Sequence, residues 1–181
     1  YIDHLIGELL LELKYLELDK ETIVVLWGDH GWHLGNDRKW GKHSLFERSL
    51  KSALIVKLPG VNHASKEINT IVETVDLYPT LLDFCGIGKP YELDGKSLVE
   101  LIQTGKSNHP NQAFGFWKNG VSLKTDRYRL TKFFREEEPK IELYDHLLDP
   151  EENINIAFDH QKTVDSLMPV LEKVTPEFYF K

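Results

Sequence analysis

Polar side chains that could bind a metal ion follow directly after an apolar segment near the start of the chain. Residues 22–27 read TIVVLW, the composition of a buried strand, and the strand breaks at Gly28. Asp29 and His30 come next, at the kind of strand end where open α/β sheets bind their ligands. An adjacent carboxylate and imidazole can supply two ligands to a divalent cation. A turn-capping Asp beside an ordinary surface His remains the alternative.

A cluster of basic residues follows this pair. Between residues 36 and 57 the chain carries six Lys or Arg residues against two acidic ones, whereas the whole chain has a formal net charge of −7. A positive segment in an acidic protein indicates a site for a small anionic group. A solvated basic face explains the same composition. The negative total argues against a general nucleic-acid-binding protein, because neutralising phosphates needs a surplus of Lys and Arg.

Helices and strands alternate in the first half of the chain, around these residues. Residues 3–18 carry apolar side chains at helical spacing and predict a helix with one apolar stripe. Strands are predicted at 22–27, 53–58 and 68–72, and a helix at 75–84. Continuous apolar strands between helices predict an α/β fold with a mainly parallel sheet. Because the first helix needs a sheet to cover, we expect the chain to begin within a fold.

The second half of the chain is predicted to be an antiparallel meander. Four short strand candidates follow one another, at residues 112–117, 121–124, 128–134 and 141–144. Asn119-Gly120 lies between the first two and indicates a hairpin, since both central positions of a type I′ turn need positive φ. A helix at 161–173, which Pro169 is expected to kink, closes the meander.

Composition and length fit an ordinary globular protein. The 181 residues are 41% hydrophobic and 28% charged, which excludes a disordered chain. The loop-like segment 105–112 predicts a boundary between a domain at 1–108 and an antiparallel subdomain at 109–181. The single cysteine, Cys85, excludes an internal disulfide and is expected to be a small buried residue. No apolar run reaches the length of a membrane span.

Several motifs in a fixed order resemble the sulfatase family, and within it the iduronate-2-sulfatase-like branch. GDHGWHLG is followed by W-x-K-x-x-x-F-E and by ALIVxxPG. Further along the chain stand TVDLYPTLLDFCGI, LDGKSLVELI, SLKTDRYRL and ELYDHLLDPEENINIA. The resemblance covers nearly the whole chain. It implies the C-terminal portion of an alkaline-phosphatase-like α/β fold, with helices and a small antiparallel C-terminal sheet and helix.

The resemblance also implies roles for residues of the loop at 28–43. Asp29 and His30 match two ligands of the family's bound Ca²⁺, although a hard cation prefers oxygen to imidazole nitrogen. Lys42 matches the lysine that contacts the sulfate ester and stabilises charge in the transition state, a catalytic role. The candidate substrate-binding residues are His33, His43, Lys39 and Arg38.

Each candidate substrate contact has a structural alternative. His33 and His43 could approach a sulfate or a sugar carboxylate, or could pack against Trp32 or Trp40. The two tryptophans in turn could stack on a sugar ring or belong to a core. For Arg38 and Lys39, the default interpretation is a solvated position on the protein surface.

The nucleophile that the family uses is absent from this sequence. Sulfatases convert a Cys or Ser within C/S-x-P-S-R to formylglycine, whose hydrate attacks sulfur while the metal polarises the sulfate oxygens. Cys85 lies in FCGIGK and does not match, and the family's N-terminal Asp-Asp metal pair is missing too. We therefore expect a missing N-terminal sulfatase segment to complete the site, and this chain alone to be inactive. The expected substrate is a sulfated carbohydrate, in particular a uronic-acid-containing glycan.

Two alternatives remain open. Zinc phosphodiesterases and phosphatases of the same superfamily also carry Asp-His-Gly, but they lack the W-x-K-x-x-x-F-E continuation. A catalytically inactive sulfatase-like fragment would act as a binding or structural piece. The resemblance implies a secreted or periplasmic location, or a lysosomal one in a eukaryote. The negative charge and the lack of a long apolar run predict neither nucleic acid nor membrane as a partner.

Overall fold

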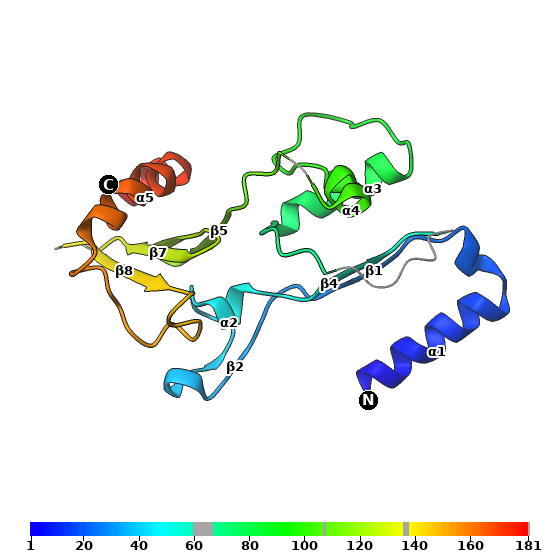
Figure 1. The fold of residues 1–181 in the computed structure, drawn as a ribbon, viewed down its shortest axis with the longest axis horizontal. Helices are drawn as coiled ribbons and strands as arrows, with labels where there is room; N and C mark the ends of the chain where they lie inside the picture. The colour runs from blue at the N-terminus through cyan, green and yellow to red at the C-terminus, as the bar shows by residue number, and fades with distance from the viewer. Residues whose placement is uncertain (60–66, 107, 136–137, 181) are drawn as a thin grey trace. The chain divides into compact units, whose positions relative to one another are not determined.

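The computed structural model describes residues 1–59, 67–106, 108–135 and 138–180 (Figure 1). These residues form two compact units. The first comprises residues 1–29 and 52–67, and the second comprises residues 30–51 and 68–181. The predicted domains, 1–108 and 109–181, stay a prediction. Each unit is described by itself.

The first unit contains helix α1 (Ile2–Tyr15) and the strands β1 (Val24–Trp27) and β4 (Leu54–Lys57). A short 3₁₀ turn, η1 (Leu18–Lys20), connects α1 to β1. No residue of α1 is buried, so its predicted apolar stripe is not covered by the described residues.

The pairing of β1 with β4 differs from the predicted parallel arrangement. The strands run antiparallel, with Val24 opposite Lys57 and Trp27 opposite Leu54. Every strand pair among the described residues is antiparallel. Parallel neighbours need a crossover connection, usually a helix of several turns. The one α-helix in the chain between β1 and β4 is α2 (Glu47–Leu50), and its four residues are too few for that purpose.

In the second unit, residues 68–72 form no strand, contrary to prediction. The Ile71 N–H donates a hydrogen bond to Asn111 Oδ1 at 2.8 Å, so this backbone group bonds to a side chain and not to a neighbouring strand. Helix α3 (Leu77–Phe84) follows a 3₁₀ turn, η3 (Thr74–Asp76). Helix α4 (Val99–Thr104) was not predicted.

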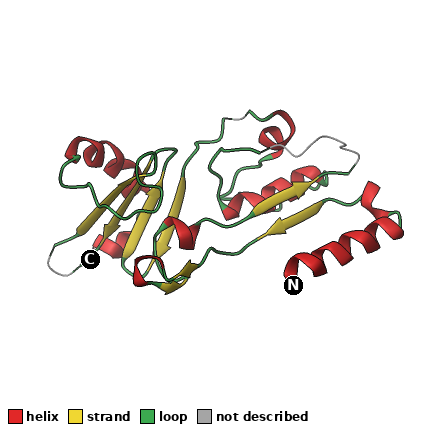
Figure 2. Cartoon of the chain, turned by 60° about the horizontal axis from the view of Figure 1, so that its bottom comes forward, coloured by secondary structure: helices red, strands yellow, loops and turns green. Residues whose placement is uncertain are grey.

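The predicted antiparallel meander is confirmed. Strands β5 (Ala113–Trp117), β6 (Gly120–Lys124), β7 (Tyr128–Phe133) and β8 (Lys140–Asp145) form one sheet in that order. Helix α5 (Gln161–Val174), with Pro169 inside it, packs against this sheet (Figure 2). The buried core between sheet and helix consists of Val121, Leu123, Leu130, Leu143, Val164 and Leu171, with Ala157 beside them.

The hairpin between β5 and β6 turns one residue earlier than predicted. Trp117 pairs with Gly120, so Lys118 and Asn119 occupy the turn, and Lys118 has a φ of 52°. Gly120 serves packing instead. A Cβ at this position would lie 2.7 Å from Leu45 Cδ1 and 2.8 Å from Phe133 Cδ1, so only glycine lets these side chains approach the strand.

Candidate functional site

Residues 30–51, here called the loop segment, lie on the sheet face opposite to α5. The segment contains a small hairpin, β2 (His33–Leu34) with β3 (Trp40–Gly41), around a 3₁₀ turn, η2 (Asn36–Arg38), and it ends in α2. Leu45 is buried, and its methyl groups approach Gly115 of β5 and Gly120 of β6. The absence of a side chain at both glycines therefore makes room for the loop segment.

The structure brings together two of the predicted site residues, His30 and Lys42. Lys42 Nζ lies 2.6 Å from His30 Nε2, and His30 Nδ1 lies 2.8 Å from the Gly31 carbonyl oxygen. Because a carbonyl only accepts, Nδ1 carries the proton and donates. Nε2 then holds a lone pair, which accepts from the Lys42 ammonium. This is the tautomer that a histidine needs to bind a metal through Nε2.

Asp29 precedes His30 in the chain and is exposed at the end of the first unit. Its carboxylate offers oxygen and the His30 ring offers a directed lone pair. Each of these donor groups is chemically suited to a site for a divalent cation. They are fewer than the six to eight ligands that Ca²⁺ takes, so such a site would need further oxygen donors.

His33 is placed inside the loop segment. Its side chain is only 2% exposed, and Nε2 hydrogen bonds with Ser44 Oγ at 2.8 Å. Ser44 Oγ in turn lies 2.6 Å from Ser49 Oγ of α2, and the Phe46 ring meets the imidazole edge-on. This histidine connects the hairpin to α2, and a substrate contact for it stays a prediction.

The other candidate substrate contacts point in different directions. His43 stacks on Trp117 of β5, with ring centroids 4.7 Å apart. Lys39 Nζ lies 3.4 Å from the centre of the Phe46 ring, a cation–π contact. Arg38 is exposed and has a φ of 60°. The described side chains thus do not gather these three residues around one point, and their substrate roles stay predictions.

The two tryptophans of the loop segment occupy different settings. Trp32 is 52% exposed and lines a cavity of about 530 Å³. The other lining residues are Gly31, Glu47, Arg48, Lys51, His146, Pro150 and Glu151. Trp40 is 75% exposed, and its indole lies against Gly35. An aromatic face and charged side chains therefore meet in the cavity at Trp32.

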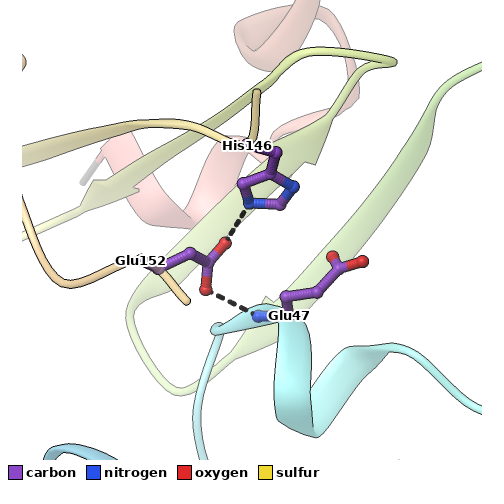
Figure 3. A group of neighbouring side chains, drawn as sticks. All are labelled: Glu47, His146 and Glu152. Atoms are coloured by element: carbon purple, nitrogen blue, oxygen red, sulfur yellow. Dashed lines mark hydrogen bonds and ion pairs between the residues drawn. The ribbon is translucent and has the colours of Figure 1, made fainter. Parts of the chain in front are cut away.

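A buried charged cluster, which the sequence analysis missed, joins the loop segment to the sheet (Figure 3). Glu47, His146 and Glu152 each offer a possible metal-ligand atom, and these atoms lie within 4.8 Å of one another. Glu152 Oε2 accepts from the Glu47 N–H at 2.7 Å. Its Oε1 accepts from Arg129 Nε and from His146 Nε2, both at 2.7 Å. Arg129 also pairs with the Glu47 carboxylate.

This cluster already contains its cation. The Arg129 guanidinium is 3% exposed and lies between both carboxylates, so we interpret the cluster as a buried ion-pair network and not as a metal site. Burial by itself raises the pKa of Glu152, but the hydrogen bond from His146 and the charge of Arg129 outweigh it and lower the pKa. Burial also lowers the pKa of Lys124, which contacts His146 Nδ1.

A signal for this cluster was present in the sequence. Arg129 stands in SLKTDRYRL and Glu152 in ELYDHLLDPEENINIA, two of the segments that carry the family resemblance. Their partnership could not be inferred from one sequence, because Glu47 precedes them by many residues. Cys85 is exposed at the end of α3, so the prediction that it is buried is wrong. Within the described ranges, no helix combines the length and apolar character needed to cross a bilayer.

Comparisons with known proteins agree on one family. The family model described as N-sulphoglucosamine sulphohydrolase, C-terminal, matches residues 28–176. A sulfatase of Formosa agariphila is 34% identical over 96% of the chain and 34% of its own length. Mouse arylsulfatase K is 30% identical over 95% of the chain and 33% of its own length. The chain thus spans about a third of these curated relatives.

The fold agrees as well. A structure solved in complex with its substrate, D-glucosamine-2-N,6-O-disulfate, superimposes with a TM-score of 0.86 at 26% identity, covering 95% of this chain and 37% of that one. The predicted α/β sulfatase fold, with helices and a small antiparallel sheet, is confirmed.

Proposed function

Because this chain belongs to the sulfatase family, whose C-terminal region it matches, we propose that it is part of an enzyme that hydrolyses sulfate esters of glycans. The contact between Lys42 and His30 is the observation that carries this proposal. It places a positive charge beside an imidazole in the tautomer that can bind a metal ion, and a bound sulfate ester would use both groups.

Lys42 acts in this proposal as the catalytic cation. Its ammonium, fixed near His30, would hold a sulfate oxygen and stabilise the charge that develops on the leaving oxygen. Asp29 and His30 would hold Ca²⁺, which when bound polarises the sulfate oxygens. His30 already has the required tautomer, because Nδ1 donates to the Gly31 carbonyl. Because the Lys42 contact uses the same Nε2 lone pair that would hold the cation, Lys42 would bond to the sulfate ester in place of His30.

The nucleophile would come from an N-terminal sulfatase segment as formylglycine. This part of the proposal rests on the motifs of the sequence and on the matched C-terminal region. The isolated chain would then be inactive, and the complete protein active. We also propose secretion, a periplasmic location or, in a eukaryote, a lysosomal one for the parent protein.

The substrate class that we propose is a sulfated, uronic-acid-containing glycan, as in the iduronate-2-sulfatase-like branch. The cavity beside Trp32 supports a carbohydrate, since its volume of about 530 Å³ lies in the range of ligand sites and one wall is an exposed indole. The charged lining residues could bond to hydroxyl and anionic groups of a sugar. Trp40, which does not line this cavity, is not assigned to the substrate.

The test is a comparison of substrates on the complete protein, with Ca²⁺ and the N-terminal segment present. We expect release of inorganic sulfate from sulfated uronate oligosaccharides, and a Lys42→Ala variant should lose most of kcat with an unchanged fold. Lys173→Ala, an exposed position on α5, is the matched control. Faster hydrolysis of phosphodiesters to phosphomonoesters, with zinc, would favour the phosphodiesterase alternative. Glycan binding without turnover of any ester would favour the inactive alternative.

A further inference from the structure

We propose that Arg129 and Glu152 are positioning residues: they hold the loop segment in place on the sheet, and through α2 they set the positions of His33 and of the backbone beside His30. Their effect on catalysis rests on the proposed sulfatase function. The positioning itself can be measured without any substrate.

Glu152 holds the first residue of α2. The Glu47 N–H belongs to the first turn of this helix and donates to Glu152 Oε2 at 2.7 Å. Glu152 is buried and has a φ of 59°, a conformation that non-glycine residues rarely adopt. The surrounding contacts must therefore hold it there. The carboxylate is thus a fixed anchor for the helix.

Arg129 fixes this anchor from the other side. Its Nε donates to Glu152 at 2.7 Å, one terminal nitrogen donates to Ser122 Oγ at 3.0 Å, and the other pairs with Glu47. A planar guanidinium provides these three directions at once, which a lysine cannot do. Ser122 and Arg129 belong to β6 and β7, so the sheet determines where the guanidinium lies.

Hydrogen bonds connect α2 to the predicted site residues in the loop segment. Ser49 of α2 hydrogen bonds with Ser44, and Ser44 with His33. The Ser49 carbonyl also accepts from the Gly31 N–H at 2.8 Å. A Cβ at Gly31 would lie 2.1 Å from the Arg48 carbonyl oxygen, so the backbone next to His30 is packed directly on α2. A shift of α2 would therefore move both histidines relative to the sheet.

The experiment is hydrogen exchange, followed by mass spectrometry, on this chain and three variants. Glu152→Gln keeps the shape but removes the charge that pairs with Arg129. We expect exchange of amides in residues 30–51 to rise at least roughly tenfold, with α5 unchanged, because Glu152 contacts Glu47, Arg129 and His146 and none of these belongs to α5. Glu151→Gln is the matched control, since Glu151 pairs with Arg48 at the surface and should leave exchange unchanged.

A milder variant covers the case in which Glu152→Gln does not fold. Ser122→Ala removes one hydrogen bond from Arg129 and leaves both ion pairs, so a smaller rise in the same residues is expected. Unchanged exchange in 30–51, or an equal rise across the sheet and α5, would overturn the positioning role. The latter result would mean general loss of stability.

Kinetics on the complete protein separate the two proposals. If the sulfatase function holds, Glu152→Gln should lower kcat by more than it raises KM, because displaced groups act on the transition state. If the complete wild-type protein has no sulfatase activity, but exchange in residues 30–51 still rises in Glu152→Gln, the proposed function is overturned and the positioning role stands. An active variant with wild-type kcat and unchanged exchange would overturn the positioning role alone.

Discussion

The two faces of the C-terminal sheet are covered in different ways. Towards α5 the sheet presents a continuous set of leucine and valine side chains. Towards the loop segment it presents glycines, Ser122, Arg129 and Thr131, all buried or half-buried. An apolar face gains stability from any close packing, whereas buried charges tolerate only one arrangement. One face therefore stabilises the subdomain, and the other determines where the loop segment lies.

The largest effect on stability is expected from replacing Arg129, the buried cation on the sheet face that meets the loop segment. Arg129→Met leaves the buried Glu152 and the half-buried Glu47 carboxylates without their shared cation, and breaking a buried pair costs about 3–5 kcal/mol of unfolding free energy. Urea denaturation of the chain measures this. Arg48→Met is the control, because its ion pair with Glu151 is solvated and should contribute less than about 1 kcal/mol. Equal losses in the two variants would contradict the special role of the buried pair.

A cavity on the apolar face should cost a similar or slightly smaller amount. Leu130 is fully buried in the core under α5, so Leu130→Ala is expected to lower the unfolding free energy by about 2–5 kcal/mol. Hydrogen exchange should then rise in α5 before it rises in the loop segment. If exchange rose equally in α5 and in the loop segment, the two faces of the sheet would belong to one cooperative unfolding unit.

An added methyl group tests the close approach of the loop segment. Gly120→Ala forces Leu45 and Phe133 to move, and overpacking of this kind costs about 1–3 kcal/mol. Gly88→Ala is the matched control, since nothing lies within 4 Å of a Cβ there and its φ is ordinary. Thermal unfolding of both variants gives the comparison. An unchanged thermal unfolding midpoint for Gly120→Ala would mean that Leu45 can move away from the strand without a loss of stability.

The smallest effect is expected from pH. The pKa of Glu152 is lowered in the fold, so its contribution to stability is present above the unfolded value of about 4.3 and is lost as the pH falls towards the folded value. Urea midpoints measured between pH 7 and pH 4 should therefore fall more steeply for the wild type than for Glu152→Gln. Parallel curves would show that this carboxylate is not linked to folding.

Local patterns predicted the meander well. The four strand candidates agree with β5 to β8 within one residue at each end, because alternating apolar residues and short turns specify hairpins locally. The strand predicted at 68–72 is wrong, since the apolar composition of this segment could not show that Ile71 bonds to Asn111. The hairpin turn was displaced by one residue, because Gly120 lies in β6 and is needed there for packing and not for the turn.

The sequence by itself determined the family, the antiparallel subdomain and the candidate groups Asp29, His30 and Lys42, because these depend on short motifs whose residue types and order are visible in one chain. Only the tertiary structure decided that Lys42 meets His30 and that Arg129 joins Glu152 to α2. It also placed Trp32, and not Trp40, at the cavity. The physical reason is that contacts between residues far apart in sequence depend on how the segments pack, which local patterns do not encode.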